Sequence, residues 1–444
     1  MVERVLDTII AHKRVELAAT APTRRRRTRA QYSLHAALAQ RGTRFIYEFK
    51  RASPSAGVLR VIDSLDDVAQ AYAGIADAVS VLTDERFFGG SLADLSFVGD
   101  RLKVPVLRKD FIIDPVQVYD AWAYGADAVL LMLSVLDDAV YRDCAAEAAR
   151  HGLEVLTEVH DEGELERALA LDAMIIGVNN RSFADLSIDL TTTTRLAPLI
   201  PDGRLCVAES GITDRATVQR LAPDVDAFLV GSALMRSPRI DLAARQLAFG
   251  EVKVCGLTRP ADAADAWHAG ASWGGVVFAE SPRQVDVHQA RAIASASPLP
   301  LVGVFVDATP EQVGALARAV PLAAVQLHGN EDDRIVAATR AALPDDCALW
   351  RAYRVGDALP PTQRGVDRVL YDCTAPGSGT RFDWSLLDAA PPGFGLAGGI
   401  TADTVAAALA TGAALLDVSS GVETAPGLKS ATRLHEFFTE IRNA

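Results

Sequence analysis

Lysine and glutamate residues close several apolar segments in the first half of the chain, where they could perform acid–base chemistry. Glu48 and Lys50 end the first of these segments, and Lys109, Glu158 and Glu209 end later ones. These residue types are rarely buried unless they are paired. Ammonium and carboxylate groups that share a partly dry pocket shift each other's pKa, as general acid–base catalysis requires. The five residues therefore predict a catalytic site.

The second half of the chain ends its apolar segments with a different set of residues. Cys255 and Asp372 are the candidates there for a general base and an acid. A lone cysteine is more often an inert apolar residue, so the prediction for Cys255 depends on Asp372 facing the same pocket. Arg283 suits a carboxylate, because its planar fork binds one with two hydrogen bonds. His328 ranks below these residues, because it is also compatible with a packing role.

Small residues follow the last two apolar segments of each half, and they predict phosphate binding. They are Ser210, Gly211, Gly231 and Ser232 in the first half, and Gly398, Gly399, Ser420 and Gly421 in the second. Glycine lets an anion approach backbone N–H groups closely. Many α/β barrels bind phosphate in the loops after their seventh and eighth strands.

The elements that position these residues repeat along the chain. Eight short apolar runs between residues 45 and 232 alternate with segments of helical spacing, and eight more lie between residues 252 and 420. This alternation indicates parallel strands, because parallel neighbours need a crossover. The sequence predicts an α/β fold of two consecutive (β/α)8 TIM barrels, in preference to an open doubly wound sheet. Functional residues of such barrels gather at the carboxyl ends of the strands, where the residues above lie.

The length of 444 residues also fits two domains. The first barrel leaves room for an extra N-terminal helix at residues 2–19, and a helix ending near Gly250 closes this half. We therefore expect domains at residues 1–250 and 251–444, with almost no linker between them. The second domain is short for a barrel of this kind.

Charge is distributed unevenly along the chain. The net charge is −13, yet residues 1–60 hold 13 Lys and Arg against 4 Asp and Glu, including four arginines at 24–27. Such a run invites a nucleic-acid interpretation. No aromatic stacking pattern accompanies it, and the acidic remainder would repel a phosphate backbone. We expect a solvated N-terminal segment and no nucleic-acid partner.

Other features bear on location and cofactors. The five cysteines form no C-x-x-C pair, which disfavours a disulfide framework and a zinc knuckle and favours a reducing cytoplasm. No apolar run approaches the ~20 residues that span a bilayer, and the first residues lack the apolar stretch of a signal peptide. No metal-ligand spacing or dinucleotide-binding glycine motif is present. We expect a cytoplasmic protein with no metal, cofactor or membrane partner.

Longer motifs resemble two enzyme families. The sequence resembles indole-3-glycerol phosphate synthase at residues 45–60, 108–114 (R-K-D-F-I-I-D), 178–187 and 208–212 (A-E-S-G-I). It resembles phosphoribosylanthranilate isomerase at residues 253–259 (K-V-C-G-L-T-R), 281–285, 325–330 (V-Q-L-H-G-N) and 377–384. Their order and the near-absent linker resemble the bifunctional fusion of tryptophan biosynthesis. One departure is Pro376, in a turn that is usually richer in glycine in the isomerase family; proline removes a backbone donor there.

For the second half, the resemblance implies an Amadori rearrangement of N-(5-phosphoribosyl)anthranilate to 1-(2-carboxyphenylamino)-1-deoxyribulose 5-phosphate. Asp372 would protonate the ring oxygen of the sugar, and Cys255 would take the C2′ proton. Arg283 would hold the anthranilate carboxylate, with His328 as a further substrate-binding residue. The phosphate would be bound by Gly398, Gly399, Ser420 and Gly421.

For the first half, the resemblance implies closure of the indole ring with loss of carbon dioxide and water. Lys109 would be the general acid, Lys50 would pair with the substrate carboxylate, and Glu158 would act in the dehydration. Glu48, Asn179 and Glu209 would orient the substrate. The remaining contacts would come from Phe111 on the aromatic ring, Arg181 on the carboxylate side, and Ser53, Ser210, Gly211, Gly231 and Ser232 on the phosphate.

Alternatives remain open on the sequence alone. One barrel could be a degenerate phosphate-binding scaffold, or the isomerase half could also accept the related aminoaldose of histidine synthesis. A nucleic-acid-binding protein that uses the basic N-terminus is a third, non-enzymatic hypothesis. We expect small phosphorylated substrates and a monomer, because the fusion already supplies a contact between barrels.

Overall fold

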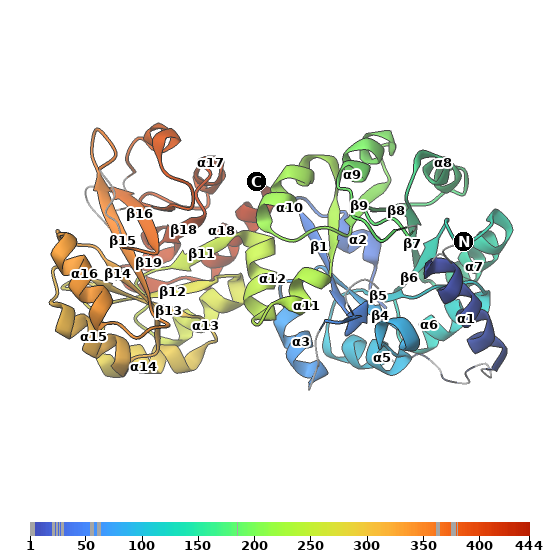
Figure 1. The fold of residues 1–444 in the computed structure, drawn as a ribbon, viewed down its shortest axis with the longest axis horizontal. Coiled ribbons are helices and arrows are strands. Elements are labelled where there is room, and N and C mark those ends of the chain that lie inside the picture. The colour runs from blue at the N-terminus through green and yellow to red at the C-terminus, as the bar shows by residue number, and fades with distance from the viewer. Residues whose placement is uncertain are drawn as a thin grey trace. The chain divides into compact units, whose positions relative to one another are not determined.

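Two closed barrels of eight parallel strands follow one another along the chain, which confirms the predicted fold (Figure 1). This computed structural model describes residues 1–444 except 1–4, 20–22, 24, 26, 28–30, 54–56, 60–63, 184, 361–364, 374–378 and 380. The side chain of Ser53 and the turn around Pro376 thus lie outside the described residues. The chain forms two compact units, Met1–Ala248 and Phe249–Ala444.

The strands of the first barrel pair in chain order, and β1 closes the ring between β4 and β10. They are β1 (Arg44–Phe49), β4 (Ala78–Leu82), β5 (Val106–Lys109), β6 (Ala128–Met132), β7 (Glu154–Val159), β8 (Ile175–Asn179), β9 (Leu205–Glu209) and β10 (Ala227–Val230). A hairpin of β2 (Ala52–Ser53) and β3 (Gly57–Val58) follows β1. Most strand side chains are buried, because the barrel interior is filled and helices cover its outside.

The helices of this unit begin at capping residues close to the strand ends. Ser91, Asp114, Asp137, Asp161 and Asp214 each accept a hydrogen bond from a backbone N–H of the following turn. The helices are α1 (Val5–Ala19), α2 (Leu34–Leu38), α3 (Leu65–Tyr72), α4 (Glu85–Phe88), α5 (Leu92–Arg101), α6 (Pro115–Ala123), α7 (Asp138–Arg150), α8 (Glu162–Ala170), α9 (Thr191–Leu196), α10 (Arg215–Leu221), α11 (Ser232–Arg236) and α12 (Ile240–Phe249).

The second barrel has the same topology with shorter crossovers. Its strands are β11 (Glu251–Val254), β12 (Trp273–Val277), β13 (Leu301–Phe305), β14 (Leu322–Leu327), β15 (Ala348–Val355), β16 (Arg368–Cys373), β17 (Gly395–Ala397) and β18 (Leu415–Val418). Its α-helices are α13 (Pro260–Ala269), α14 (Val287–Ala296), α15 (Pro310–Ala319), α16 (Asp333–Ala342), α17 (Val405–Ala410) and α18 (Ala431–Asn443).

Two crossovers of the second barrel differ from the helix that the repeat predicts. The described residues between β15 and β16 form no helix, and those between β16 and β17 form the 3₁₀ helix η3 (Trp384–Ala389). The connection between β15 and β16, residues 356–367, is the shortest between consecutive strands of this barrel. After β18, the 3₁₀ helix η4 (Ser420–Val422) leads into a hairpin of β19 (Glu423–Ala425) and β20 (Leu428–Lys429).

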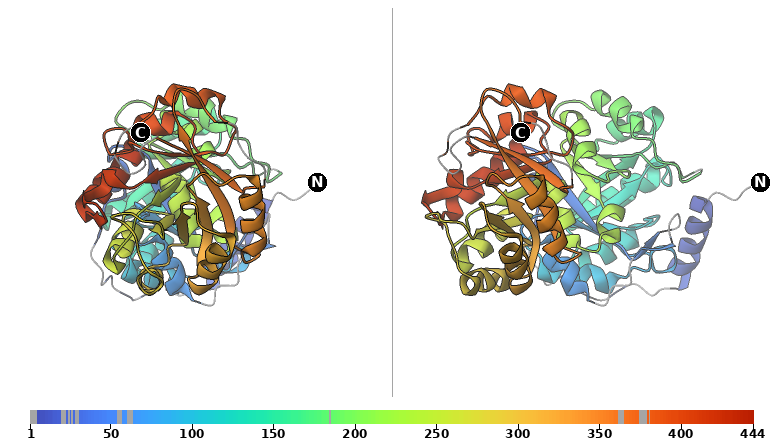
Figure 2. Two further views of the ribbon diagram at one scale, coloured as in Figure 1. Left: turned by 90° about the vertical axis from the view of Figure 1, so that its left-hand side faces the viewer. Right: turned by 60° about the vertical axis from the view of Figure 1, so that its left-hand side comes forward.

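Helix α1 is the extra helix predicted before the first barrel (dark blue in Figure 2). Its Ile9 belongs to the apolar core of that barrel. Lys13, 1% exposed, lies 3.0 Å from a carboxylate oxygen of Asp84 and 3.0 Å from one of Asp110. Burial alone would lower the pKa of Lys13, but Asp110 and Asp84 raise it above its ordinary value. Buried ion pairs therefore attach α1 beyond the ends of β4 and β5.

The basic run is only partly exposed. The Arg27 side chain is 7% exposed and its guanidinium lies 2.5 Å from the buried carboxylate of Asp127. The Arg25 guanidinium lies over the ring of Tyr124, 4.7 Å from its centre. The expectation of a solvated segment is thus wrong at Arg27, because Asp127, just before β6, supplies a buried counter-charge. Residues 24 and 26 lie outside the described residues.

Among the described residues, no helix is long and apolar enough to cross a membrane. No group of three or more His, Cys, Asp or Glu among them is placed to hold a metal ion.

We predict that Lys13→Met destabilises the first barrel and releases α1. Removing one partner of a buried ion pair costs about 3–5 kcal/mol, because the other charges stay buried without it. Hydrogen exchange of the α1 amides and urea unfolding of the first barrel measure the two effects. Lys103→Met, at an exposed lysine, is the control. Unchanged α1 protection in Lys13→Met would contradict the prediction.

Candidate active sites

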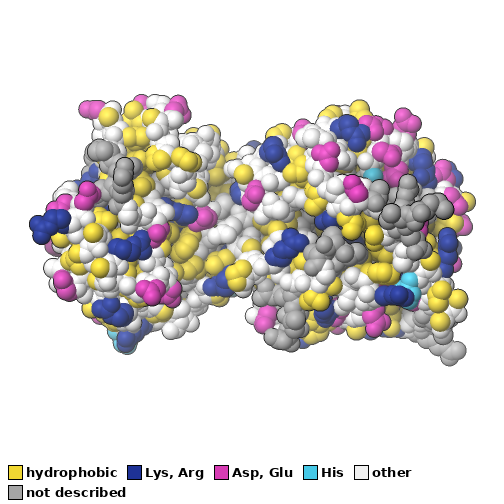
Figure 3. Space-filling view, viewed as in Figure 1, with side chains coloured by type: hydrophobic (Ala, Val, Ile, Leu, Met, Phe, Trp, Pro, Cys, Tyr) yellow, Lys and Arg dark blue, Asp and Glu magenta, His cyan; other side chains and the backbone are white. Residues whose placement is uncertain are grey.

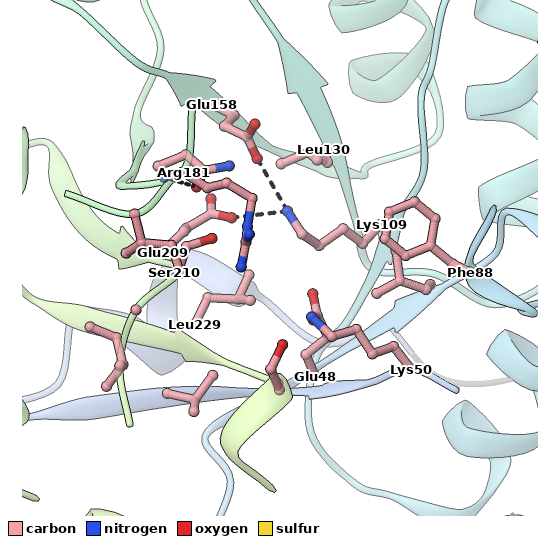
Figure 4. Close-up of a pocket in the computed structure, with 18 of the residues that line it drawn as sticks. Glu48, Lys50, Phe88, Lys109, Leu130, Glu158, Arg181, Glu209, Ser210 and Leu229 are labelled. Atoms are coloured by element: carbon pink, nitrogen blue, oxygen red, sulfur yellow. Dashed lines mark hydrogen bonds and ion pairs between the residues drawn. The ribbon is translucent and has the colours of Figure 1, made fainter. Parts of the chain in front are cut away.

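The carboxyl ends of the strands in the first barrel surround a pocket (Figure 4). The predicted residues that line it are Glu48, Lys50, Lys109, Phe111, Glu158, Asn179, Arg181, Glu209, Ser210, Gly211, Gly231 and Ser232. They lie at or just beyond strand ends, where a parallel barrel places its loops on one face. Ser53 is on β2, and its side chain lies outside the described residues.

Lys109 is the centre of this pocket. Its Nζ lies 3.1 Å from Glu158 Oε2 and 2.9 Å from Glu209 Oε2, as the dashed lines in Figure 4 show. Lys50 Nζ lies 2.6 Å from Glu48 Oε1. Burial alone would lower the pKa of Lys109, but Glu209, Glu158 and Glu48 raise it above its ordinary value. Lys109 is therefore an ammonium at neutral pH.

The two carboxylates beside Lys109 are driven to different protonation states. Burial, helped by the charge of Glu158, raises the pKa of Glu209 to about 7. Burial also raises the pKa of Glu158, but Lys109 and His160 outweigh it, so that this pKa lies below its ordinary value. One carboxyl can thus keep a proton while its neighbour is ionised, which is the arrangement that acid–base chemistry uses.

His160 is a neighbour of the site that the sequence analysis missed. Its Nδ1 lies 3.1 Å from Glu164 Oε2, and its Nε2 lies 3.4 Å from Glu158 Oε1. Burial would lower the pKa of His160, but the Glu164 and Glu158 carboxylates raise it. The sequence feature that could have identified His160 is its position two residues after Glu158, on the loop that follows β7.

Aromatic and small residues shape the rest of the pocket. The Phe111 ring packs between those of Phe88 and Phe183, with centroid distances of 6.0 and 6.4 Å. A Cβ at Gly231 would lie 2.2 Å from Glu48 Oε1, so only glycine fits beside that carboxylate. Helix α1 contributes to the wall as well, although no residue of that helix was predicted to do so.

A second pocket lies at the carboxyl ends of the strands of the other barrel. It is lined by the predicted Cys255, Arg283, His328, Asp372, Gly398, Gly399 and Ser420. Gly421 is not among the residues that line this pocket. A Cβ on it would lie 2.1 Å from the backbone oxygen of Ile400, so its glycine serves close packing of two loops.

Asp372 has the properties of a proton donor. Burial, with the nearby charge of Asp417, raises its pKa to about 6. His328 Nε2 lies 3.5 Å from Asp372 Oδ2. Burial and the charge of Lys253 lower the pKa of His328 to about 3, so its imidazole is neutral. A Cβ at Gly398 would lie 2.7 Å from Asp372 Oδ1, which makes glycine necessary here.

Cys255 lies beside a buried ion pair that the sequence analysis missed. Lys253 Nζ lies 3.3 Å from Cys255 Sγ, 2.7 Å from Asp417 Oδ2 and 2.8 Å from Gln326 Oε1. Burial raises the pKa of the Cys255 thiol, and Lys253 opposes that rise. The sequence feature that could have identified this pair is Lys253 itself, a lysine inside an apolar strand two residues before Cys255.

Arg283 is already paired in this structure. Its Nε lies 2.9 and 3.2 Å from the two carboxylate oxygens of Glu423, and its Nη2 lies 2.7 Å from Glu423 Oε2. Glu423 lies on β19, beyond the strands in which site residues were sought. The predicted role of Arg283 as a receptor for a carboxylate therefore involves a partner that the sequence did not reveal.

Two family models match the chain, one for each barrel. The model of indole-3-glycerol phosphate synthase matches residues 6–247. The model of N-(5'-phosphoribosyl)anthranilate isomerase matches residues 252–440. The two matches cover both barrels in their order along the chain.

Relatives match this chain over nearly its whole length. The tryptophan biosynthesis protein TrpCF of Vibrio cholerae is 47% identical, over 94% of this chain and 90% of that protein. The TrpCF protein of Corynebacterium glutamicum is 43% identical, over 90% of this chain and 88% of that protein. A solved phosphoribosylanthranilate isomerase of Thermus thermophilus is 34% identical, with a TM-score of 0.39, and covers 43% of this chain and 98% of its own.

We predict a carboxyl group in the first barrel that loses its proton near pH 7. Below that pH, Glu209 is protonated because burial favours its neutral form. Infrared difference spectra between pH 5 and 9 should contain a protonated-carboxyl band that Glu209→Gln removes. Lys109→Met should shift the midpoint upward, because Lys109 favours the ionised form. Glu166→Gln, at an exposed glutamate, is the control, and a band that survives Glu209→Gln would refute the assignment.

Proposed function

The chain belongs to the TrpCF family of bifunctional tryptophan-biosynthesis enzymes, and from this premise we propose which residues carry its two reactions. The first barrel is the indole-3-glycerol phosphate synthase unit, a carboxy-lyase, and the second is the phosphoribosylanthranilate isomerase unit. We propose that the two enzymes meet near Gly250, as domains of residues 1–250 and 251–444.

In the second barrel, Asp372 and Cys255 act as acid and base. Asp372 gives its proton to the ring oxygen of the phosphoribosyl group, the bond from that oxygen to C1′ breaks, and the nitrogen lone pair forms an iminium. Burial raises the pKa of Cys255, so its thiolate is the minor form, which Lys253 favours. This thiolate takes the C2′ proton, and the resulting enolamine becomes the ketose when its hydroxyl proton moves to C1′. The observation that supports this most is the raised pKa of Asp372, about 6, beside a neutral His328. A buried acid of this kind keeps its proton where a surface aspartate would not.

In the first barrel, Lys109 is the general acid. It protonates the ketose carbonyl oxygen while the aromatic ring carbon bonds to the carbonyl carbon, and the carboxylate leaves as carbon dioxide. Glu158 then serves the loss of water, and Lys50 pairs with the carboxylate before it leaves. The contacts of Lys109 with both Glu158 and Glu209 support this role.

Other residues bind the phosphorylated substrates. In the first barrel Glu48, Asn179 and Glu209 orient the substrate, and Phe111 and Arg181 contact its anthranilate part. Phosphate is bound there by Ser53, Ser210, Gly211, Gly231 and Ser232. In the second barrel Arg283 receives the carboxylate, His328 contacts the substrate, and Gly398, Gly399 and Ser420 bind the phosphate. Gly421, which does not line the pocket, serves the phosphate site by packing the loop of Ser420 against Ile400.

We also propose a monomer in the cytoplasm, without nucleic-acid or membrane partners. All five cysteines are free thiols, in keeping with a reducing compartment. The Arg27 guanidinium pairs with Asp127 instead of facing solvent. On the face drawn in Figure 3, cationic and anionic side chains are interspersed, unlike the single-sign surface that binds a phosphate backbone.

Two substitutions should separate the reactions. Cys255→Ala should lower isomerase turnover by about 10²–10⁴-fold, because it removes the base, and leave indole closure unchanged. Lys109→Ala should do the reverse. Each half-reaction is assayed with its own substrate. The controls are Cys347→Ala, a buried cysteine away from the pocket, and Lys103→Ala.

Three outcomes would contradict the proposal. Equal loss of both activities in either variant would argue against independent sites. A wild-type chain that performs one half-reaction only would have a degenerate barrel. Competition by the histidine-pathway aminoaldose would show that the isomerase unit is not confined to one substrate.

A further inference from the structure

The ion pair between Arg283 and Glu423 affects how strongly Arg283 can attract the carboxylate of the substrate. Both carboxylate oxygens of Glu423 are bonded by Arg283, and neither side chain is more than 12% exposed. An isolated pair of this kind has no net charge. It would offer little attraction to the second carboxylate that the proposed function assigns to Arg283.

A second cation lies behind the pair. Lys429 Nζ lies 2.7 Å from Glu423 Oε1 and 3.2 Å from the backbone oxygen of Ser419. The Lys429 side chain is 0% exposed. Glu423 and Lys429 are cross-strand partners in the hairpin of β19 and β20. The backbone N–H of Gly427, at the turn, also donates to Glu423 Oε1 over 3.2 Å.

The three side chains therefore form an ordered row from the pocket into the hairpin. Arg283 lines the pocket, whereas Glu423 and Lys429 do not. With one carboxylate between two cations, the row carries a net charge of about +1. Burial lowers the pKa of Lys429, and the carboxylate of Glu423 opposes this effect. Burying an ammonium costs free energy. Because Arg283 already bonds the carboxylate of Glu423, that carboxylate alone does not explain why Lys429 is buried beside it.

The guanidinium of Arg283 is held in one orientation by Glu423. Glu423 occupies its Nε and one edge of the guanidinium, while Nη1 makes no hydrogen bond to the described residues. A planar fork held on one edge keeps the other edge in a constant orientation. Pre-orientation of this kind reduces the entropy that a binding step must lose.

We propose that Lys429 is a positioning residue for the substrate carboxylate: it balances Glu423, so that Glu423 can orient Arg283 without cancelling its charge. The inference rests on the proposed role of Arg283 and adds two residues that act through it. Glu423 supplies orientation and Lys429 supplies charge.

Charge rescue distinguishes this role from a purely structural one. Lys429→Met lowers the net charge of the row to about zero, and the KM for N-(5-phosphoribosyl)anthranilate should rise at least about tenfold. A fall in kcat would be a separate effect, because Lys429 also lowers the pKa of the Cys255 thiol. Lys429→Arg keeps the charge and should keep the KM. In the double variant Glu423→Gln/Lys429→Met, only Arg283 remains charged, and most of the lost affinity should return.

Several controls accompany the measurement. Urea unfolding of the second barrel reports whether each variant is folded there, because indole closure tests only the first unit. Arg291→Met removes an exposed cation of α14 and should leave the KM unchanged. N-(5-phosphoribosyl)aniline, which lacks the carboxylate, should have the same KM with the wild type and with Lys429→Met.

The results that overturn the proposal are distinct from those that overturn its premise. An unchanged KM in Lys429→Met, or a double variant as impaired as the single one, would make Lys429 a structural residue of the hairpin. Arg283→Met tests the premise separately. If that variant binds the carboxylated substrate normally, the proposed role of Arg283 fails, whatever Lys429 does.

Discussion

Burial of charge at the mouths of the two barrels is the constraint on which both sites depend. The interior of a closed parallel barrel is filled with apolar side chains, so an ionised group at its rim is stable only beside a partner. Lys109 lies between Glu158 and Glu209, and Lys253 lies beside Asp417. Because these partners also shift pKa values, the pairing that makes the rim stable determines which groups hold protons.

The two barrels apply this constraint to different chemistry. Around Lys109 there are more carboxylates than ammoniums, so that Glu209 keeps a proton up to about pH 7 while Glu158 is ionised. In the second barrel, burial and the charge of Asp417 favour the protonated form of Asp372, and Lys253 opposes the rise that burial causes in the pKa of the Cys255 thiol. Both arrangements place a proton donor and a proton acceptor at one mouth.

Elements outside the strands complete each mouth, and each is attached through an ion pair. Helix α1 reaches Asp84 and Asp110 through Lys13. The β19–β20 hairpin is joined to Arg283 through Glu423. Ion pairs therefore help to attach these elements to the barrels, in addition to apolar packing.

The sequence by itself determined the repeat of strands and helices, and with it the end of the barrel at which a residue lies. That spacing was enough to predict Lys109, Glu158, Cys255 and Asp372, since periodicity is local. Partners were a different matter, because Arg283 and Glu423 are 140 positions apart and Lys253 and Asp417 are 164 apart. Only the closed tertiary structure brings such residues into contact, and the interaction of their charges, which sets pKa values and occupies Arg283, acts over ångströms in space and not along the chain.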